Sequence, residues 1–214
     1  MPDATAIYIA SPEGDTGKST IALGLLHRLA ATVANVGVFR PIVRAGTGRD
    51  YILDLLLAHS TAGLDYDDCA GVTYQQLHDD PDAAIADIVD RYHRVADKCG
   101  AVVIVGSDYT DVASPSELSM NARIAVNLGA PVLLSVRAAD RTPGEVAHVV
   151  ELCLAELAAQ HAHTAVFING IFHTDAAFRR CLLISSVMVA VHIQHRRPAE
   201  GGQKREVLRR HIPA

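Results

Sequence analysis

The sequence predicts an α/β fold built on a parallel, doubly wound sheet. Short apolar runs that suit buried strands recur along the chain, and stretches with helical periodicity separate them. Such alternation carries the chain back across the sheet after each strand, so that successive strands run parallel. The 214 residues are 50% hydrophobic, and this length and composition suit one compact domain with a substantial core.

Each element of this fold follows from a local pattern. Five strands are expected, at residues 6–10, 36–39, 102–105, 132–136 and 165–168. Helices are expected at residues 19–33, 50–59, 82–98, 116–129 and 143–160. In the helix at 82–98 the apolar residues recur on one face, and Pro81 suits its first turn. Residues 61–80 are interpreted as a looped insertion over one end of the sheet.

The C-terminal part of the chain departs from this alternation. After Asn169 a continuous apolar run at residues 181–193 is followed by a tail rich in arginine. Residues 171–214 carry eight Lys or Arg and three Asp or Glu, whereas residues 1–170 carry 11 and 21. We therefore expect an α/β domain at 1–170 and a basic segment at 171–214. The apolar run is either a buried sixth strand or part of a non-native end produced by truncation or a reading-frame change.

The loop after the first strand carries the strongest functional signal. The sequence SPEGDTGKST, residues 11–20, lies between a strand and a helix, as a phosphate-binding P-loop does. Backbone N–H groups of such a loop bind phosphate oxygens, Lys18 adds a positive charge, and the Ser19 hydroxyl suits Mg²⁺. The expected ligands are ATP or another nucleotide, together with Mg²⁺. The loop residues expected to bind the nucleotide are Gly14, Asp15, Thr16, Gly17, Lys18, Ser19 and Thr20.

This loop departs from the full consensus at one position. The pattern G-x-x-x-x-G-K-[ST] has a glycine five residues before Gly17, where this chain has Pro12. The alternative is an ordinary strand-to-helix turn capped by small polar residues. The order of strand, GKST and helix favours the P-loop.

Further candidates follow other strands, because ligands of doubly wound sheets lie at the carboxyl ends of the strands. Arg40 follows the second strand and could direct a permanent cation towards a phosphate or carboxylate; the alternative is a solvated arginine before a turn proline. The third strand is followed by Gly106, and Asp108 is the candidate carboxylate near the metal, unless this segment is only a turn. Asn169 closes the fifth strand, where its amide could pair with a purine edge or occupy a turn.

Polar residues after the fourth strand have two interpretations. Arg137 and Asp140 could line the same crevice as the other strand-end residues. Asp140 and Thr142 could instead cap the helix that begins near Pro143, and this capping role is favoured.

Composition argues against several classes of protein. The four cysteines form no C-x-x-C pair and are interpreted as reduced thiols packed in the core. The basic segment has no aromatic residue after Phe178 for base stacking, so nucleic acid is not an expected partner. No apolar stretch reaches the length of a membrane span, and no basic region precedes the first apolar run, so a cytoplasmic protein without a membrane anchor is expected.

With these residues placed, the chain resembles the amino-terminal P-loop domain of bacterial phosphate acetyltransferase (phosphotransacetylase) over residues 5–169. The resemblance rests on AIYIASPEGDTGKSTIALGLLHRL, VGVFRPIVR, RDYILDLLLAH, GVTYQQLHDDPDAAIADIVDRYH, VVIVGSDYTDV and NARIAVNLGAPVLLSVRAADRTPGEV, in that order. That domain is similar to dethiobiotin synthetase, whose P-loop also lacks the first consensus glycine. The resemblance implies a doubly wound sheet of the P-loop NTPase, dethiobiotin synthetase-like type.

The resemblance also implies what the chain does. Acetyl transfer between coenzyme A and phosphate belongs to a carboxy-terminal domain of the family, so we expect no acetyltransferase activity from this chain alone. The expected function is a regulatory domain that binds a nucleotide or small-molecule metabolite and forms homo-oligomers. One alternative is an ATP-dependent ligase like dethiobiotin synthetase, although that enzyme has a lysine where Arg40 stands and a glutamate where Gly106 stands. The other is a structural or oligomerisation domain with a vestigial P-loop.

Overall fold

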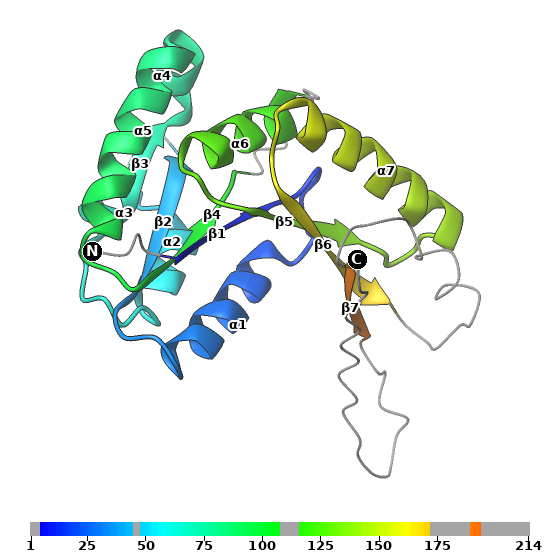
Figure 1. The fold of residues 1–214 in the computed structure, drawn as a ribbon, viewed down its shortest axis with the longest axis horizontal. Helices are drawn as coiled ribbons and strands as arrows, with labels where there is room; N and C mark the ends of the chain where they lie inside the picture. Colours follow the sequence, from blue (N-terminus) through cyan, green and yellow to red (C-terminus); the bar gives the residue numbers. More distant parts are fainter. Residues whose placement is uncertain (1–4, 45–47, 108–115, 172–188, 194–214) are drawn as a thin grey trace.

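The fold is organised around one sheet in which all neighbouring strands are parallel. The computed structural model describes residues 5–44, 48–107, 116–171 and 189–193. The sheet has seven strands in the order β3-β2-β4-β1-β5-β6-β7 (Figure 1). These are β1 (Thr5–Ala10), β2 (Val36–Val43), β3 (Ala70–Thr73), β4 (Ala101–Val105), β5 (Val132–Arg137), β6 (Thr164–Ile171) and β7 (Val189–Ile193). Every adjacent pair is parallel, which confirms the predicted fold class.

Helices cover both faces of this sheet. They are α1 (Lys18–Ala30), α2 (Tyr51–Leu57), α3 (Tyr66–Cys69), α4 (Tyr74–Asp79), α5 (Pro81–Ala96), α6 (Ser116–Asn127) and α7 (Pro143–Ala159). In Figure 1, α1 lies on one side of the sheet and α5, α6 and α7 lie in a row on the other. Within the described ranges, no helix combines the length and the apolar character needed to cross a membrane.

The two longest helices begin where the sequence places their caps. At the start of α5 the Asp80 carboxylate accepts a hydrogen bond from the Ala83 N–H, and Pro81 occupies the first turn. At the start of α7 the Thr142 hydroxyl and the Glu145 side chain form a reciprocal capping box. Asp140 does not cap α7; its carboxylate pairs with Arg137 at 2.9 Å. Of the two candidate caps for this helix, Thr142 therefore has the role.

The interpretation of residues 61–80 as a looped insertion is wrong. The segment contains α3, β3 and α4, and β3 extends the sheet by pairing with β2, with Ala70 opposite Arg40. The strand has only four residues, and one of them is Gly71. A Cβ atom on Gly71 would overlap the backbone of Pro41, so the glycine allows β3 to approach β2. A four-residue run that contains glycine carries too little alternation for a strand to be recognised from sequence.

Part of the C-terminal segment joins the same sheet. Residues Val189–Ile193 form β7, which pairs with β6 so that Val189 lies opposite Val166. Of the two interpretations of the apolar run at 181–193, the additional strand is thus observed for its last five residues. β7 therefore covers the edge that β6 would otherwise expose. The edges of the sheet are β3 and β7.

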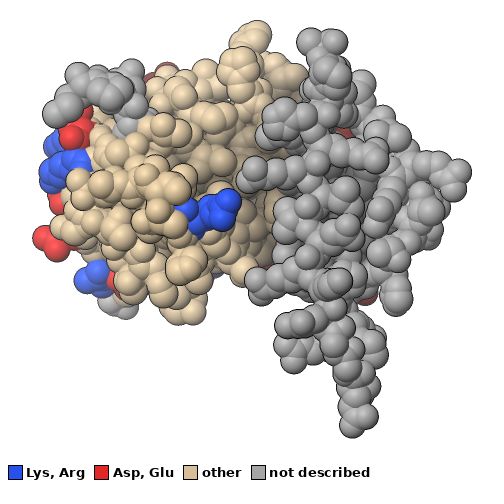
Figure 2. Space-filling view, turned by 60° about the horizontal axis from the view of Figure 1, so that its bottom comes forward, with Lys and Arg blue, Asp and Glu red and all other residues tan. Residues whose placement is uncertain are grey.

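The outer side of α1 is poor in charge. This helix contains no Asp or Glu, and its Lys18 is buried, whereas Arg28 in its last turn is exposed. Figure 2 brings this side of the molecule forward and shows a broad surface of neutral residues in the described part of the chain. Lys18 and Arg28 are therefore two cations of one helix in opposite environments, and substitutions at these positions can be compared directly.

The described cysteines are packed into the fold as thiols. Cys69, Cys99 and Cys153 are free, and Cys69 and Cys153 are buried. Burial raises the pKa of Cys69 to about 12 and the pKa of Cys153 to about 11. A raised pKa lowers the fraction of thiolate, which is the form that reacts with alkylating reagents.

We therefore expect Cys69 and Cys153 to resist alkylation at pH 8.5. Iodoacetamide should modify both about a hundredfold more slowly in the native protein than in the urea-unfolded chain, because thiolate is scarce and access is restricted. Peptide mass spectrometry after timed quenching follows each cysteine separately. Equal rates in the native and unfolded protein would contradict the packing described for these two side chains.

Candidate functional site

The predicted P-loop lies between β1 and α1, at the carboxyl edge of the sheet. Asp15 and Gly17 both have positive φ, 55° and 82°, and Gly17 is the N-cap residue of α1. A left-handed glycine at this position turns the chain sharply into the helix. Among the described residues, no side chain caps the N-terminus of α1. The first N–H groups of the helix are thus oriented as an anion-binding terminus requires.

Lys18 reaches from the start of α1 to the end of β4. Its side chain is 3% exposed, and its ammonium donates to the carbonyl oxygens of Ser107 at 2.9 Å and Gly106 at 3.3 Å. The strands β1 and β4 are neighbours, and the Gly106 N–H donates to the Ile9 carbonyl at 2.9 Å. The predicted loop lysine and the predicted strand end are therefore brought together in one place.

Arg40 contacts the same end of β4, but in a different arrangement from the one expected, because it lies within β2 rather than after it and is buried rather than solvated. The side chain is 2% exposed, and Nη1 donates to the carbonyls of Gly106 at 2.7 Å and Val105 at 3.2 Å. Its Nε forms an ion pair with the Asp50 carboxylate at 3.3 Å. Arg40 is therefore held among buried groups, where it fastens the end of β4 to the residue that precedes α2.

A buried polar network that was not predicted from the sequence surrounds Gly106 and Ser107 at the end of β4. The Tyr8 hydroxyl donates to Asn121 Oδ1 at 2.7 Å, and the Ser107 N–H donates to the same oxygen at 3.1 Å. Asn121 Nδ2 donates to the carbonyls of Glu117 at 2.9 Å and Ser107 at 3.3 Å. Burial raises the pKa of the Tyr8 phenol, which therefore remains a hydrogen-bond donor. The sequence feature that could have indicated this network is Asn121, a polar residue on the otherwise apolar face of α6.

The position at the end of β4 has no room for a side chain. A Cβ atom on Gly106 would overlap Asn121 Oδ1 and would lie 2.8 Å from Tyr8 Cε1. The Tyr8–Asn121 pair thus fills the space that a strand-end carboxylate would need. The packing of Tyr8 and Asn121 around this position therefore accommodates glycine and no larger residue.

The P-loop is also tied to the segment between β5 and α7. Arg141 binds the Glu13 carboxylate with two nitrogens, of which Nη2 lies 2.7 Å from Glu13 Oε2. The Ser11 hydroxyl donates to the Glu13 carbonyl at 2.8 Å, and the Ser135 hydroxyl of β5 donates to the Thr16 carbonyl at 3.0 Å. These contacts fix the course of the loop from both sides.

The remaining predicted site residues are less well defined. Ser19 is half-buried and Thr20 is exposed, in the first turn of α1. Asn169 lies in β6 opposite Arg137, while its side chain is outside the described part. Asp108 is likewise outside the described residues. In the part that the structure describes, no three His, Cys, Asp or Glu side chains gather as metal ligands would.

The family of the chain follows from a match that covers most of its length. A protein-family model described as an AAA domain matches residues 5–198. The chain belongs to this family. The match includes the P-loop and all seven strands, so β7 lies within the family domain.

Curated relatives of this AAA domain are phosphate acetyltransferases. The chain is 29% identical to the enzyme of Nitratidesulfovibrio vulgaris over 155 residues, which is 69% of this chain and 22% of that protein. It is 27% identical to the enzyme of a Synechocystis species over 157 residues, 70% of this chain and again 22% of the relative. The chain therefore spans about 22% of these relatives and is a P-loop domain related to their amino-terminal region.

Solved structures with a similar fold are P-loop proteins. A putative plasmid partition protein of Borrelia burgdorferi, bound to AMPPNP, matches 91% of this chain and 88% of that chain, with a TM-score of 0.55 and 14% identity. A GTPase of Pyrococcus abyssi in its apo form covers 89% of each chain, with a TM-score of 0.52 and 12% identity. At these identities the similarity establishes the fold alone.

Proposed function

We propose that this AAA domain is a regulatory module that binds a nucleoside triphosphate, or a phosphorylated metabolite, in its P-loop without turning it over. The observation that carries the proposal is the placement of Lys18. A buried ammonium beside a helix N-terminus that no described side chain caps, together with the left-handed Gly17, is the donor set that binds phosphate groups in such loops. Nucleotide-bound neighbours of the same fold support this choice of ligand.

Binding without turnover is supported by the packing at Gly106. Phosphoryl transfer in P-loop enzymes depends on a strand-end carboxylate that holds the metal or its water shell. Because Tyr8 and Asn121 occupy the space beside Gly106, that carboxylate has no place at this position. The same feature disfavours a ligase like dethiobiotin synthetase as the function of this chain.

Magnesium is the cation that would accompany a bound nucleotide. The Ser19 hydroxyl in the first turn of α1 is proposed as a metal ligand in the manner of P-loop proteins. Asp108, two residues beyond Gly106 in the sequence, is proposed as a carboxylate near the cation, distinct from the strand-end carboxylate that phosphoryl transfer requires. The cation would neutralise phosphate charge there. Asn169, in β6, is proposed to line the same crevice, whereas Arg40 supports it from the core by holding the end of β4.

Replacing Lys18 by alanine is expected to lower the affinity for ATP by about ten- to a hundredfold, because a charge-assisted hydrogen bond to phosphate is lost. Calorimetric titration of the purified chain with ATP, with and without Mg²⁺, measures this effect. Lys18→Met keeps most of the buried aliphatic stem and separates a loss of charge from a loss of packing. Arg28→Ala, which removes an exposed cation from the same helix, serves as the control.

Two outcomes of this titration would contradict the proposal. Unchanged affinity in both Lys18 variants would show that the loop does not bind the phosphates. Steady release of phosphate by the unmodified chain would contradict binding without turnover.

Self-association of the domain is part of the proposal as well. Light scattering coupled to gel filtration measures the mass in solution, and a mass of one chain would contradict self-association.

A further inference from the structure

We propose that Arg141 is a second phosphate-binding cation of this site and that Glu13 holds its guanidinium beside the loop until a phosphate group replaces the carboxylate. The inference rests on the proposed function. Glu13 belongs to the P-loop, four residues before Gly17, whereas Arg141 comes from the segment between β5 and α7. The two side chains meet across 128 positions of sequence.

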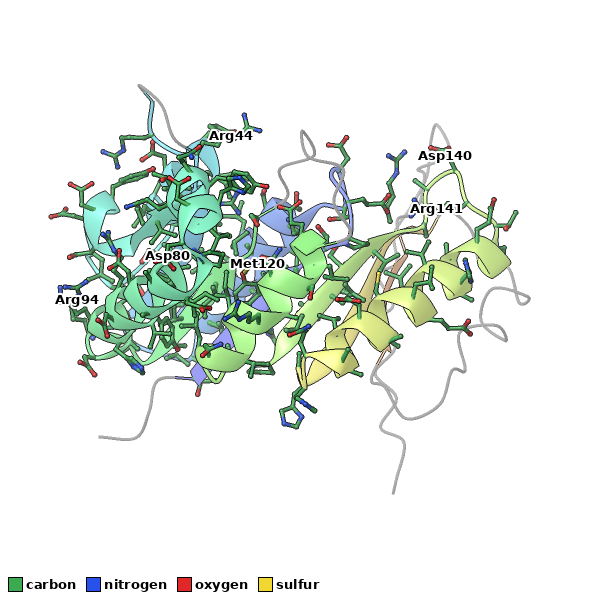
Figure 3. All side chains as sticks on the ribbon, turned by 90° about the horizontal axis from the view of Figure 1, so that it is seen from above. Arg44, Asp80, Arg94, Met120, Asp140 and Arg141 are labelled. Carbon is green, nitrogen blue, oxygen red and sulfur yellow. The ribbon has the colours of Figure 1, made fainter. Side chains whose placement is uncertain are left out.

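The geometry of the pair is that of a bidentate clamp. Arg141 Nη1 and Nη2 bind the two carboxylate oxygens of Glu13, and Nη1 also donates to the Arg137 carbonyl at 3.0 Å. Figure 3 places Arg141 at the edge of the molecule where the β1–α1 loop lies. The hydrogen bond to Glu13 raises the pKa of Arg141, so the guanidinium is charged at all working pH values.

An acidic side chain is unfavourable in a loop that binds polyanions. The charge of Glu13 opposes the approach of phosphate, and the bound guanidinium cancels that charge. A phosphate group offers Arg141 the same two-pronged acceptor that the carboxylate offers, with more negative charge. Arg141 is 27% exposed, in contrast to the buried Lys18 and Arg40, so its side chain can turn from one acceptor to the other.

A purely structural role for the pair leads to different results. If the clamp only fastens the loop, loss of either partner loosens the loop and weakens phosphate binding. If Glu13 holds a phosphate-binding arginine in reserve, loss of Glu13 removes both a repelling charge and a competing acceptor. The two roles therefore differ in the sign of the effect of Glu13→Gln.

The experiment compares the unmodified chain with Glu13→Gln, Arg141→Gln and the double variant, by titration with ATP and with inorganic tripolyphosphate. Glu13→Gln is expected to bind about fivefold more tightly. Arg141→Gln is expected to bind about tenfold more weakly, both alone and in the Glu13→Gln background. Both ligands should respond equally, because the contact is to phosphate. Arg141→Lys should retain part of the affinity.

The matched control is Arg137→Gln, which removes an arginine that pairs with Asp140 in the same segment and does not bind the P-loop carboxylate. Its affinity should change less than about twofold. Weaker or unchanged binding by Glu13→Gln would overturn the inference, as would an Arg141→Gln substitution without effect in the Glu13→Gln background. An unmodified chain that binds neither ligand would overturn the proposed function as well as this inference.

Discussion

Replacing Asp50 by alanine is expected to lower the free energy of unfolding by about 3–5 kcal/mol, since it breaks a buried ion pair. The Arg40 and Asp50 side chains are 2% and 6% exposed, so water cannot replace the lost carboxylate. Asp50 also caps α2, because its Oδ1 accepts a hydrogen bond from the Leu53 N–H at 3.0 Å. The substitution therefore removes a charge partner and a helix cap together.

Urea unfolding measures this effect, and two variants isolate its causes. Asp50→Asn keeps a side chain that caps helices well but removes the charge, so it should retain only the capping part of the stability. Asp54→Ala removes an exposed carboxylate of the same helix, which pairs with Arg49 at 2.7 Å, and should cost less than about 1 kcal/mol. Equal losses at positions 50 and 54 would refute the view that Asp50 stabilises the buried Arg40.

Replacing Asn121 by alanine is expected to lower the free energy of unfolding by about 2–4 kcal/mol, because buried groups lose their hydrogen-bond partner. The Asn121 amide oxygen accepts from the Tyr8 hydroxyl and the Ser107 N–H, and its nitrogen donates to the Glu117 carbonyl. These bonds lie in the fully buried network at the end of β4. An alanine leaves the Tyr8 phenol without this acceptor.

Chemical denaturation of three variants tests this network. Tyr8→Phe removes one donor and leaves Asn121 bound to Ser107, so the loss should be about 1 kcal/mol. Asn127→Ala is the control on the same helix. The Asn127 amide is exposed and donates to the Arg123 carbonyl, so its loss should cost well under 1 kcal/mol. If Asn121→Ala costs no more than Asn127→Ala, the network does not stabilise the fold as described.

Both predictions concern the carboxyl end of β4, where the residues that stabilise the fold share hydrogen-bond acceptors with the proposed phosphate-binding lysine. Lys18 and Arg40 both donate to the Gly106 carbonyl, and Asn121 and Lys18 both donate to the Ser107 carbonyl. A substitution that shifts these carbonyls therefore also shifts the resting position of the P-loop lysine. We expect the variants that destabilise this end to change phosphate affinity even though none of them touches the ligand.

The elements with strong local signals could be predicted from sequence. Five strands are continuous apolar runs, α5 has a regular apolar face, and α7 begins at a capping box. Each of these elements can therefore be recognised from a pattern of about ten residues. The P-loop can also be recognised from the sequence, because its glycine, lysine and hydroxyl residues are consecutive. The strand β3 could not be recognised, because its four residues become a strand only by pairing with β2.

By itself the sequence determined the α/β class, the order of most elements and the position of the P-loop, since these depend on periodicity, caps and adjacent residues. Only the tertiary structure decided which side chains surround that loop. Arg40 with Asp50, Tyr8 with Asn121, and Glu13 with Arg141 are brought together by the parallel sheet, which aligns the carboxyl ends of distant strands at one edge. A local sequence pattern does not predict these side-chain pairs, because the partners come into contact only when the strands pair and the core is buried.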